Sequence, residues 1–406
     1  KMLDNTQSII CAFGLAAAVP RSPYRHLELC GIAIRTFYKG VVYLFSDRLL
    51  RRCCYPCIFA PFLSSYHDLE VTNPMKKITA LLALLMLGGA LAGCGKQNDT
   101  NKTDKLSIVT TIFPEYDWVR TVLGDKADNA EVTMLLDNGI DLHSYQPTAD
   151  DIVKISDCDL FLYVGGESDG WVDDALKNAT NKNMKVINLL DVLGDSVKTE
   201  EVVEGMQETE HDHDHDHSKE VSTFEDEEEK DEHVWLSLKN AEVFVNAISK
   251  SLQELDPDNR DTYAANAAAY IEKLSALDGE YQAAVDAATY KTVVFGDRFP
   301  FRYLVDDYGL RYYAAFVGCS AETEASFETV SFLAKKVDEL KLPCVLTIEG
   351  AQHKIAETIV RNTAEKNQKV LTMDSLQSTS SKDVANGTTY LSVMEKNLSV
   401  LKEALG

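Results

Sequence analysis

The chain has 406 residues, of which 45% are hydrophobic, and 40 basic and 64 acidic residues give it a formal net charge of -24. This apolar content suffices for one large core or two ordinary ones, which excludes a wholly disordered chain. The acidic excess repels phosphate groups, so it excludes nucleic acid as a general partner and makes cations the more natural ligands.

The first 74 residues differ from the rest of the chain. They begin with Lys1, carry scattered arginines and cysteines, and show no sustained period of 2 or 3.6. Because a secretion signal begins at Met75, we interpret residues 1–74 as a non-native upstream extension outside the fold.

A lipoprotein signal peptide is expected at residues 75–94. A Met-Lys-Lys start precedes an apolar run at 78–91, which is too short for a confident membrane span, and the stretch ends in Leu-Ala-Gly-Cys at Cys94. This ending resembles the bacterial lipobox, in which the cysteine is lipidated and becomes the mature N-terminus. We therefore expect Cys94 to be a lipid anchor and the polar residues 95–105 to be a flexible tether.

The next part of the chain predicts a first α/β lobe over residues 106–258. Short apolar or β-branched runs alternate with helix-compatible stretches, which favours a parallel sheet covered by helices. The expected strands are 106–112, 131–137, 159–164 and 184–188.

A low-complexity insert is expected at residues 207–231. Its composition buries too little apolar surface to offset the entropy of ordering, so we expect no fixed structure there. Neutral imidazole is a preferred ligand of zinc, copper and nickel, so a run of four histidines alternating with aspartates predicts auxiliary metal capture. The histidines are His211, His213, His215 and His217. The acidic run at 225–229 favours a solvated loop instead.

Beyond residue 237 the pattern changes. Two helical stretches, 238–255 and 260–289, are broken by Asp-Pro-Asp at 256–258, and residues 259–290 are expected to form a long connecting helix. A second alternating series then predicts a second α/β lobe over 291–406. Its expected strands are 292–295, 310–316, 344–348 and 370–373, and its expected helices are 326–340 and 351–367.

The predicted fold class is therefore α/β, with two lobes that each contain a parallel sheet flanked by helices and are joined by a long rigid helix. Ligands of open α/β sheets bind outside the carboxyl ends of the strands, which places the expected site at the interface of the lobes.

Two isolated histidines occur in contexts unlike the insert. His143 lies in a turn-rich stretch after an expected strand, and His233 lies just before an expected helix. Each histidine alone fits an ordinary structural role better than a ligand role. Their surroundings, taken together, favour ligation.

From Met75 to the C-terminus, the chain resembles the zinc and manganese solute-binding lipoproteins of ABC importers, a family that includes bacterial adhesins. Residues 141–148 (DLHSYQPT) resemble the family's D-P-H-x-Y-x-P-T, and residues 232–236 (EHVWL) resemble its P-H-x-W-L, with the histidine-rich insert just before the second motif. The resemblance implies two α/β lobes, a long helix between them and one metal ion at their interface.

The resemblance also implies which residues hold the metal. In the family each lobe supplies two ligands: two histidines, here His143 and His233, then a histidine or glutamate, then an aspartate. Asp374 fits the last position because it lies at an expected strand end.

The third position departs from the family. Counting back from the Tyr-Gly-Leu at 308–310 places Arg298 where the family has histidine, and a guanidinium has no lone pair to donate to a metal. Asp297, Glu349 or water is left to fill this place. We favour Asp297, with Arg298 pairing with a carboxylate and orienting it.

These features predict a binding protein and not an enzyme. We expect a monomer, lipid-anchored at the cell surface or in the periplasm, that captures Zn²⁺ and delivers it to an ABC permease driven by a separate ATPase. Manganese is the alternative metal, because imidazole paired with carboxylate suits both ions. A surface metal buffer or adhesin is the main competing function. A zinc metalloenzyme is the other, although the sequence lacks H-E-x-x-H and G-x-x-x-x-G-K motifs.

Overall fold

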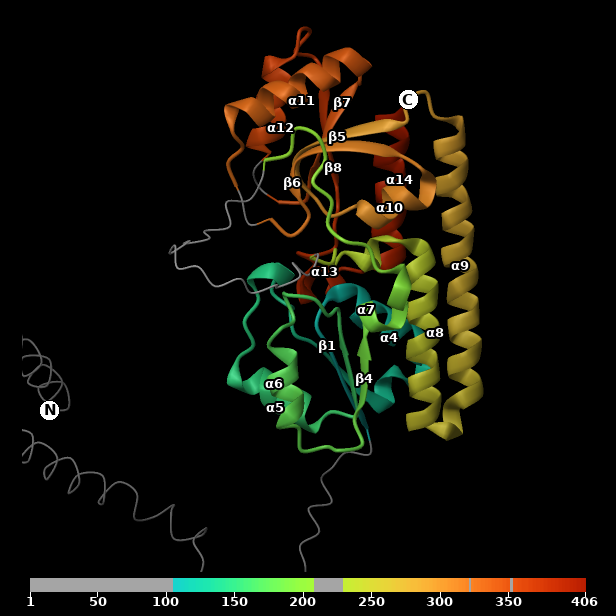
Figure 1. Cartoon of the computed structure of the whole chain (residues 1–406). Coiled ribbons are helices and arrows are strands. Elements are labelled where there is room, and N and C mark those ends of the chain that lie inside the picture. Colours follow the sequence, from blue (N-terminus) through green and yellow to red (C-terminus); the bar gives the residue numbers. More distant parts are fainter. Residues whose placement is uncertain (1–104, 208–228, 321–322, 351–352) are drawn as a thin grey trace, which may run out of the picture. The chain divides into compact units, whose positions relative to one another are not determined.

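A computed structural model gives the fold and describes residues 105–207, 229–320, 323–350 and 353–406 (Figure 1). The predicted upstream extension, the signal peptide with Cys94, nearly all of the tether and the four histidines of the insert lie outside the described residues. Within the described ranges, no helix combines the length and the apolar character needed to cross a membrane.

The first sheet is parallel, with the strand order β2-β1-β3-β4. Ile108 and Val109 of β1 are fully buried, because this strand has neighbours on both sides and helices pack against the sheet. The strands are β1 (Leu106–Thr110), β2 (Ala130–Met134), β3 (Leu160–Tyr163) and β4 (Lys185–Asn188). The accompanying helices and 3-10 turns are α4 (Phe113–Leu123), η2 (Gly124–Asn129), η3 (Leu142–Ser144), α5 (Ala149–Asp157), α6 (Val172–Lys177), α7 (Leu189–Leu193), η4 (Gly194–Ser196) and η5 (Val234–Leu236).

The second sheet repeats this arrangement, with four parallel strands in the order β6-β5-β7-β8. Ser326 and Thr389 each accept a hydrogen bond from a backbone N–H in the first turn of the helix that follows, which fixes where those two helices begin. The strands are β5 (Thr292–Phe299), β6 (Arg311–Val317), β7 (Cys344–Ile348) and β8 (Lys369–Met373). The helices are α10 (Arg302–Tyr308), α11 (Phe327–Leu340), α12 (Lys354–Asn362), α13 (Ser381–Ala385) and α14 (Tyr390–Leu405).

Two long helices connect the sheets. α8 (Leu238–Leu255) ends before the short turn η6 (Pro257–Asn259), and α9 (Arg260–Ala287) then runs for 28 residues. α9 packs against α4 and α8 of the first lobe and against α10 and α14 of the second (Figure 1). The predicted long helix between two α/β lobes is therefore confirmed.

Aromatic side chains fasten the second lobe to the first. Tyr390 of α14 lies with its ring centroid 5.1 Å from that of Trp118 in α4, and Trp118 lies 5.6 Å from Phe244 in α8. The Tyr390 hydroxyl also donates a hydrogen bond to the Trp235 carbonyl at 2.7 Å. These residues belong to one hydrophobic cluster with members from both sheets, so the two lobes share a core.

The bounds of several elements differ from the sequence prediction, and two of these differences lie close to the predicted ligands. β5 continues to Phe299 past a register irregularity between Phe295 and Arg298, where the strand passes close to α12. A Cβ atom on Gly296 would lie 2.4 Å from the Ala356 Cα atom, so glycine is required at this crossing.

The second difference concerns the ends of the expected insert. Residues expected to lack structure have definite partners: the Gln207 N–H donates to the Ala315 carbonyl at 3.0 Å, and the Asp231 N–H donates to the Lys198 carbonyl at 2.9 Å. Asp231 is only 2% exposed. The prediction of no fixed structure is therefore wrong for Gln207 and Asp231, and residues 208–228 of the expected insert lie outside the described residues.

Candidate metal centre

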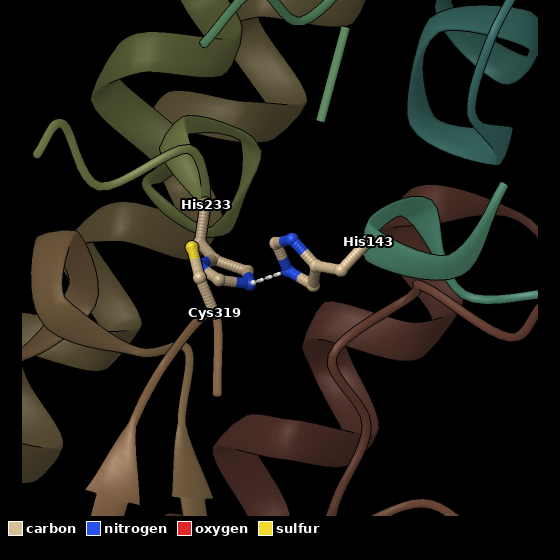
Figure 2. Close-up of side chains that lie close together, drawn as sticks. All are labelled: His143, His233 and Cys319. Carbon is tan, nitrogen blue, oxygen red and sulfur yellow. Dashed lines mark hydrogen bonds between the residues drawn. The ribbon is translucent and has the colours of Figure 1, made fainter. Parts of the chain in front are cut away.

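Three side chains meet beyond the carboxyl ends of strands from both sheets. His143, in η3 after β2, His233, just before η5, and Cys319, directly after β6, carry ligand atoms that all lie within 4.8 Å of one another (Figure 2). In the part of the chain that the structure describes, they are the only such group of three or more His, Cys, Asp or Glu side chains.

His143 is held by polar groups of the first lobe. The Asp141 carboxylate accepts a hydrogen bond from the His143 backbone N–H at 3.0 Å and so begins the 3-10 turn. The ring Nδ1 lies 2.8 Å from the Ser168 hydroxyl and 3.5 Å from Glu232 Oε2. Burial, and then the neighbouring His233, lower the pKa of His143 to about 3, so this imidazole is neutral at physiological pH. Metal ligation requires the neutral form.

His233 is fully buried. Its backbone N–H and its ring Nδ1 both lie about 3 Å from Asp231 Oδ1, at 2.9 and 3.0 Å. A carboxylate only accepts hydrogen bonds, so Nδ1 carries the proton and Nε2 keeps its lone pair. The Trp235 ring packs 5.2 Å from the imidazole and fixes its plane.

The two imidazoles face each other through their Nε2 atoms, which are 3.2 Å apart (Figure 2). Two nitrogens that each lie about 2.0–2.1 Å from a tetrahedral zinc ion are about 3.3 Å apart. Glu232 lies beside His143 Nδ1 and favours a proton there, so both Nε2 lone pairs converge. This donor pair fits a divalent metal ion.

Cys319 is the site residue that the sequence analysis missed. Its backbone N–H donates to Glu200 Oε1 at 2.9 Å, which holds the loop after β6 in place. A Cβ atom on Gly318 would lie 2.9 Å from His233 Cε1, so this glycine allows the loop to approach the imidazole. A lone cysteine carries no motif. The one available indication is its position just past an expected strand, at the edge where ligands bind.

Arg298 and Asp297 point to different partners. Arg298 donates a hydrogen bond to the Asp141 carboxylate and so joins β5 to the turn that carries His143. Asp297 accepts hydrogen bonds from the Thr347 hydroxyl at 2.6 Å and from its own neighbour's N–H at 3.0 Å. The structure does not bring Asp297 into the cluster of His143, His233 and Cys319.

Glu349 and Asp374 lie together at the ends of β7 and β8. Glu349 accepts two hydrogen bonds of 2.7 Å from the N–H and the hydroxyl of Ser375, and Asp374 accepts one of 2.8 Å from the Leu376 N–H. Burial raises the pKa of both carboxyls, and Asp374 raises that of Glu349 further. Neither is a member of the cluster, but the Ser375 carbonyl accepts a 2.9 Å hydrogen bond from Trp235, beside His233.

Comparison with known proteins gives the family. The family model described as ZnuA, zinc-uptake complex component A, periplasmic, matches residues 108–404. The chain is 35% identical over 329 residues to the zinc-binding lipoprotein AdcA of Streptococcus pneumoniae. The aligned region covers 81% of this chain and 61% of that protein. It is 31% identical over 334 residues to the high-affinity zinc uptake system protein ZnuA of Bacillus subtilis, over 81% of this chain and 98% of that protein.

A solved structure agrees with these relatives. The zinc-bound ZnuA-like domain of S. pneumoniae AdcA superposes on this chain with a TM-score of 0.56 and is 32% identical to it in sequence. The superposition covers 74% of this chain and 99% of that domain. The chain thus spans about six-tenths of the length of the streptococcal AdcA lipoprotein that it matches. The resemblance read from the two histidine motifs is confirmed, and the chain belongs to the ZnuA family of zinc-uptake binding proteins.

Proposed function

We propose that this protein binds one Zn²⁺ ion between its two lobes, outside the cytoplasm, and delivers it to an ABC-type membrane importer. The observation that carries the proposal is the 3.2 Å approach of the His143 and His233 Nε2 atoms, with the opposite nitrogen of each ring held by a polar partner. The names of the relatives, a zinc-binding lipoprotein and a zinc uptake protein, favour zinc as the cargo.

His143 and His233 supply the imidazole ligands in this proposal, and the second lobe supplies the rest. Asp374 is the carboxylate that the family pattern favours. The third ligand position is a separate one, for which Asp297 is favoured and Glu349 or water are the alternatives; either carboxylate would have to leave the hydrogen bonds described above. Trp235, which packs against His233, donates a hydrogen bond to the Ser375 carbonyl. This bond holds the loop after β8 next to the site.

The chain's other features fit a carrier at a membrane surface. We propose that Cys94 is the lipid anchor, that the four histidines of the insert raise the local metal concentration, and that the loaded monomer is recognised by a permease. A separate ATPase supplies the energy, because this sequence has no G-x-x-x-x-G-K loop. Since the two lobes share one hydrophobic cluster, release of the ion involves loop or small lobe rearrangements and not wide opening.

Calorimetric titration tests the proposal. Zinc and then manganese are titrated into the chain with residues 211–217 deleted, and into the same protein carrying His143→Ala and His233→Ala. His353→Ala is the matched control, because His353 contacts Thr347 outside the cluster. Circular dichroism checks that each variant folds.

One tight zinc equivalent that survives the deletion and His353→Ala, and is lost in the double variant, supports the interlobe site. Loss of all tight binding on deletion of the insert supports a surface metal buffer or adhesin instead. Tighter binding of manganese than of zinc overturns the assignment of the cargo.

A further inference from the structure

Cys319 lies at the end of the strand beside Arg298, the residue that cannot serve as the third ligand. Arg298 pairs with Phe316 in the register between β5 and β6, so Cys319 stands three positions beyond its cross-strand neighbour, at the same edge of the sheet. Its sulfur lies within 4.8 Å of the ligand nitrogens of His143 and His233 (Figure 2). A ligand missing from one strand is therefore available from the strand beside it.

Asp297 is a poorer candidate for the same place. Its Oδ2 atom accepts from the Thr347 hydroxyl at 2.6 Å and from the Ile348 N–H at 3.4 Å, and its Oδ1 atom accepts from the Arg298 N–H at 3.0 Å. These bonds hold the carboxylate over β7. Ligation by Asp297 would break them and require a rearrangement of the bulge in β5, whereas the Cys319 sulfur is already beside both imidazoles.

The charges around Cys319 suit a dication. Asp231 and Glu232 are each 2% exposed, and Glu200 contacts the loop that carries the cysteine. Two nearby guanidinium groups are already paired with carboxylates, Arg298 with Asp141 and Arg302 with Glu201 and Asp306.

We propose that Cys319 is the third ligand of the metal site and that its thiolate makes the site select zinc over manganese. The proposal rests on the proposed zinc-binding function and names the residue that sets its metal specificity. When Zn²⁺ binds, the thiol proton leaves to solvent and a zinc–sulfur bond of about 2.3 Å forms beside the two imidazoles. Soft thiolate ligands favour zinc, whereas manganese prefers oxygen ligands. A thiolate in the third ligand position therefore excludes manganese.

Cobalt substitution reads out the sulfur ligand directly. Co²⁺ is added to the chain lacking residues 211–217, and the absorption spectrum is recorded for this protein and for variants Cys319→Ser, Cys319→Asp and Cys344→Ser. Cys344 is the matched control, a buried free cysteine in β7 outside the cluster. Zinc and manganese affinities are measured on the same proteins.

The proposal expects an intense near-ultraviolet sulfur-to-cobalt band that Cys344→Ser retains and both Cys319 variants lose. Cys319→Ser should weaken zinc binding by about tenfold or more, while Cys319→Asp should recover part of the zinc affinity and gain manganese binding. This recovery shows that the site still folds.

A second readout does not depend on cobalt. Zinc should protect Cys319 from alkylation by iodoacetamide, with the modified peptides mapped by mass spectrometry, and His143→Ala with His233→Ala should abolish the protection. Tight zinc binding that needs both histidines but gives no sulfur band and no protection of Cys319 overturns this inference alone. Zinc binding that is indifferent to both histidines overturns the proposed function itself.

Discussion

Arg298 of β5 donates a hydrogen bond to the carboxylate of Asp141, the residue that begins the turn carrying His143. The two side chains come from different lobes and are only 19% and 18% exposed. Burial raises the pKa of Asp141, but the Arg298 guanidinium and His143 together outweigh it, so the pKa lies below its usual value. A residue that cannot bind metal thus positions a histidine that can.

The Arg298–Asp141 pair should couple the lobes energetically. Arg298→Met or Asp141→Asn leaves a partly buried partner unpaired, and each should lower the free energy of unfolding by about 1–3 kcal/mol. The double variant should cost less than the sum of the two, with a coupling energy of at least about 0.5 kcal/mol. Urea denaturation of the metal-free proteins measures this cycle.

The exposed pair Lys185–Glu254 is the control for this cycle, because solvent screens it and no measurable coupling is expected. Additive effects of Arg298→Met and Asp141→Asn would show that the contact does not stabilise the interface.

Gly166 should be intolerant of a side chain. Its φ is +87°, and a Cβ atom would lie 2.3 Å from Glu232 Oε1, beside His143. Gly166→Ala should lower the free energy of unfolding by about 1–3 kcal/mol and weaken zinc binding, because Glu232 must move. Gly279→Ala, in α9 with no atom within 4 Å of the added carbon, should instead raise stability by about 0.5–1 kcal/mol. Equal effects of the two substitutions, measured by thermal and urea denaturation, would refute the steric argument.

His143 should make the metal-free protein less stable in acid. Its pKa falls from 6.5 to about 3 on folding because of burial and the nearby His233, so the unfolded chain takes up this proton first. The stability that this group contributes is therefore present above about pH 6.5 and lost as the pH falls toward 3. The His143→Gln side chain does not titrate. The wild-type unfolding free energy minus that of the variant should thus decrease between about pH 7 and pH 4, and a constant difference would contradict the shift.

Glu115 should have the opposite pH dependence. It is fully buried at the start of α4 and accepts hydrogen bonds from Thr111 and Ile112, and burial, then Asp169, raise its pKa from 4.5 to about 8. The folded chain therefore keeps a proton that the unfolded chain loses above about pH 4.5. Stability from this group is full below that pH and is lost as the pH rises through 8.

Glu115→Gln remains neutral at all these pH values. Its unfolding free energy relative to wild type should rise between about pH 5 and pH 9, because each pKa unit corresponds to about 1.4 kcal/mol. Glu280→Gln, the same substitution at an exposed position of α9, is the matched control. A flat difference for Glu115→Gln would mean that the buried carboxyl is ionised in the folded chain.

Local sequence patterns were sufficient for most of the fold. The helix expected at 238–255 has those bounds in α8, because Ser237 accepts a hydrogen bond at its start and Pro257 follows its end. The strand expected at 292–295 extends to 299, past an irregularity at which Gly296 packs closely against Ala356 of α12. Such packing between distant segments has no local sequence pattern.

The site was only partly predictable for the same reason. His143 and His233 stand in motifs whose residues also build their surroundings, such as Asp141 beside the first and Trp235 beside the second. Cys319 comes near them only because β6 ends close to both histidines, an arrangement between distant segments that no short pattern encodes. The ligand roles of Asp297, Glu349 and Asp374 stay predictions.

Anomalous diffraction at the zinc absorption edge, on crystals of the zinc-loaded chain lacking residues 211–217, tests the central claim most directly. The account predicts one strong peak about 2.0–2.1 Å from the Nε2 atoms of both His143 and His233 and about 2.3 Å from the Cys319 sulfur. A peak held by Asp297, Glu349 or Asp374 without the two histidines, or no peak between the lobes, would contradict it.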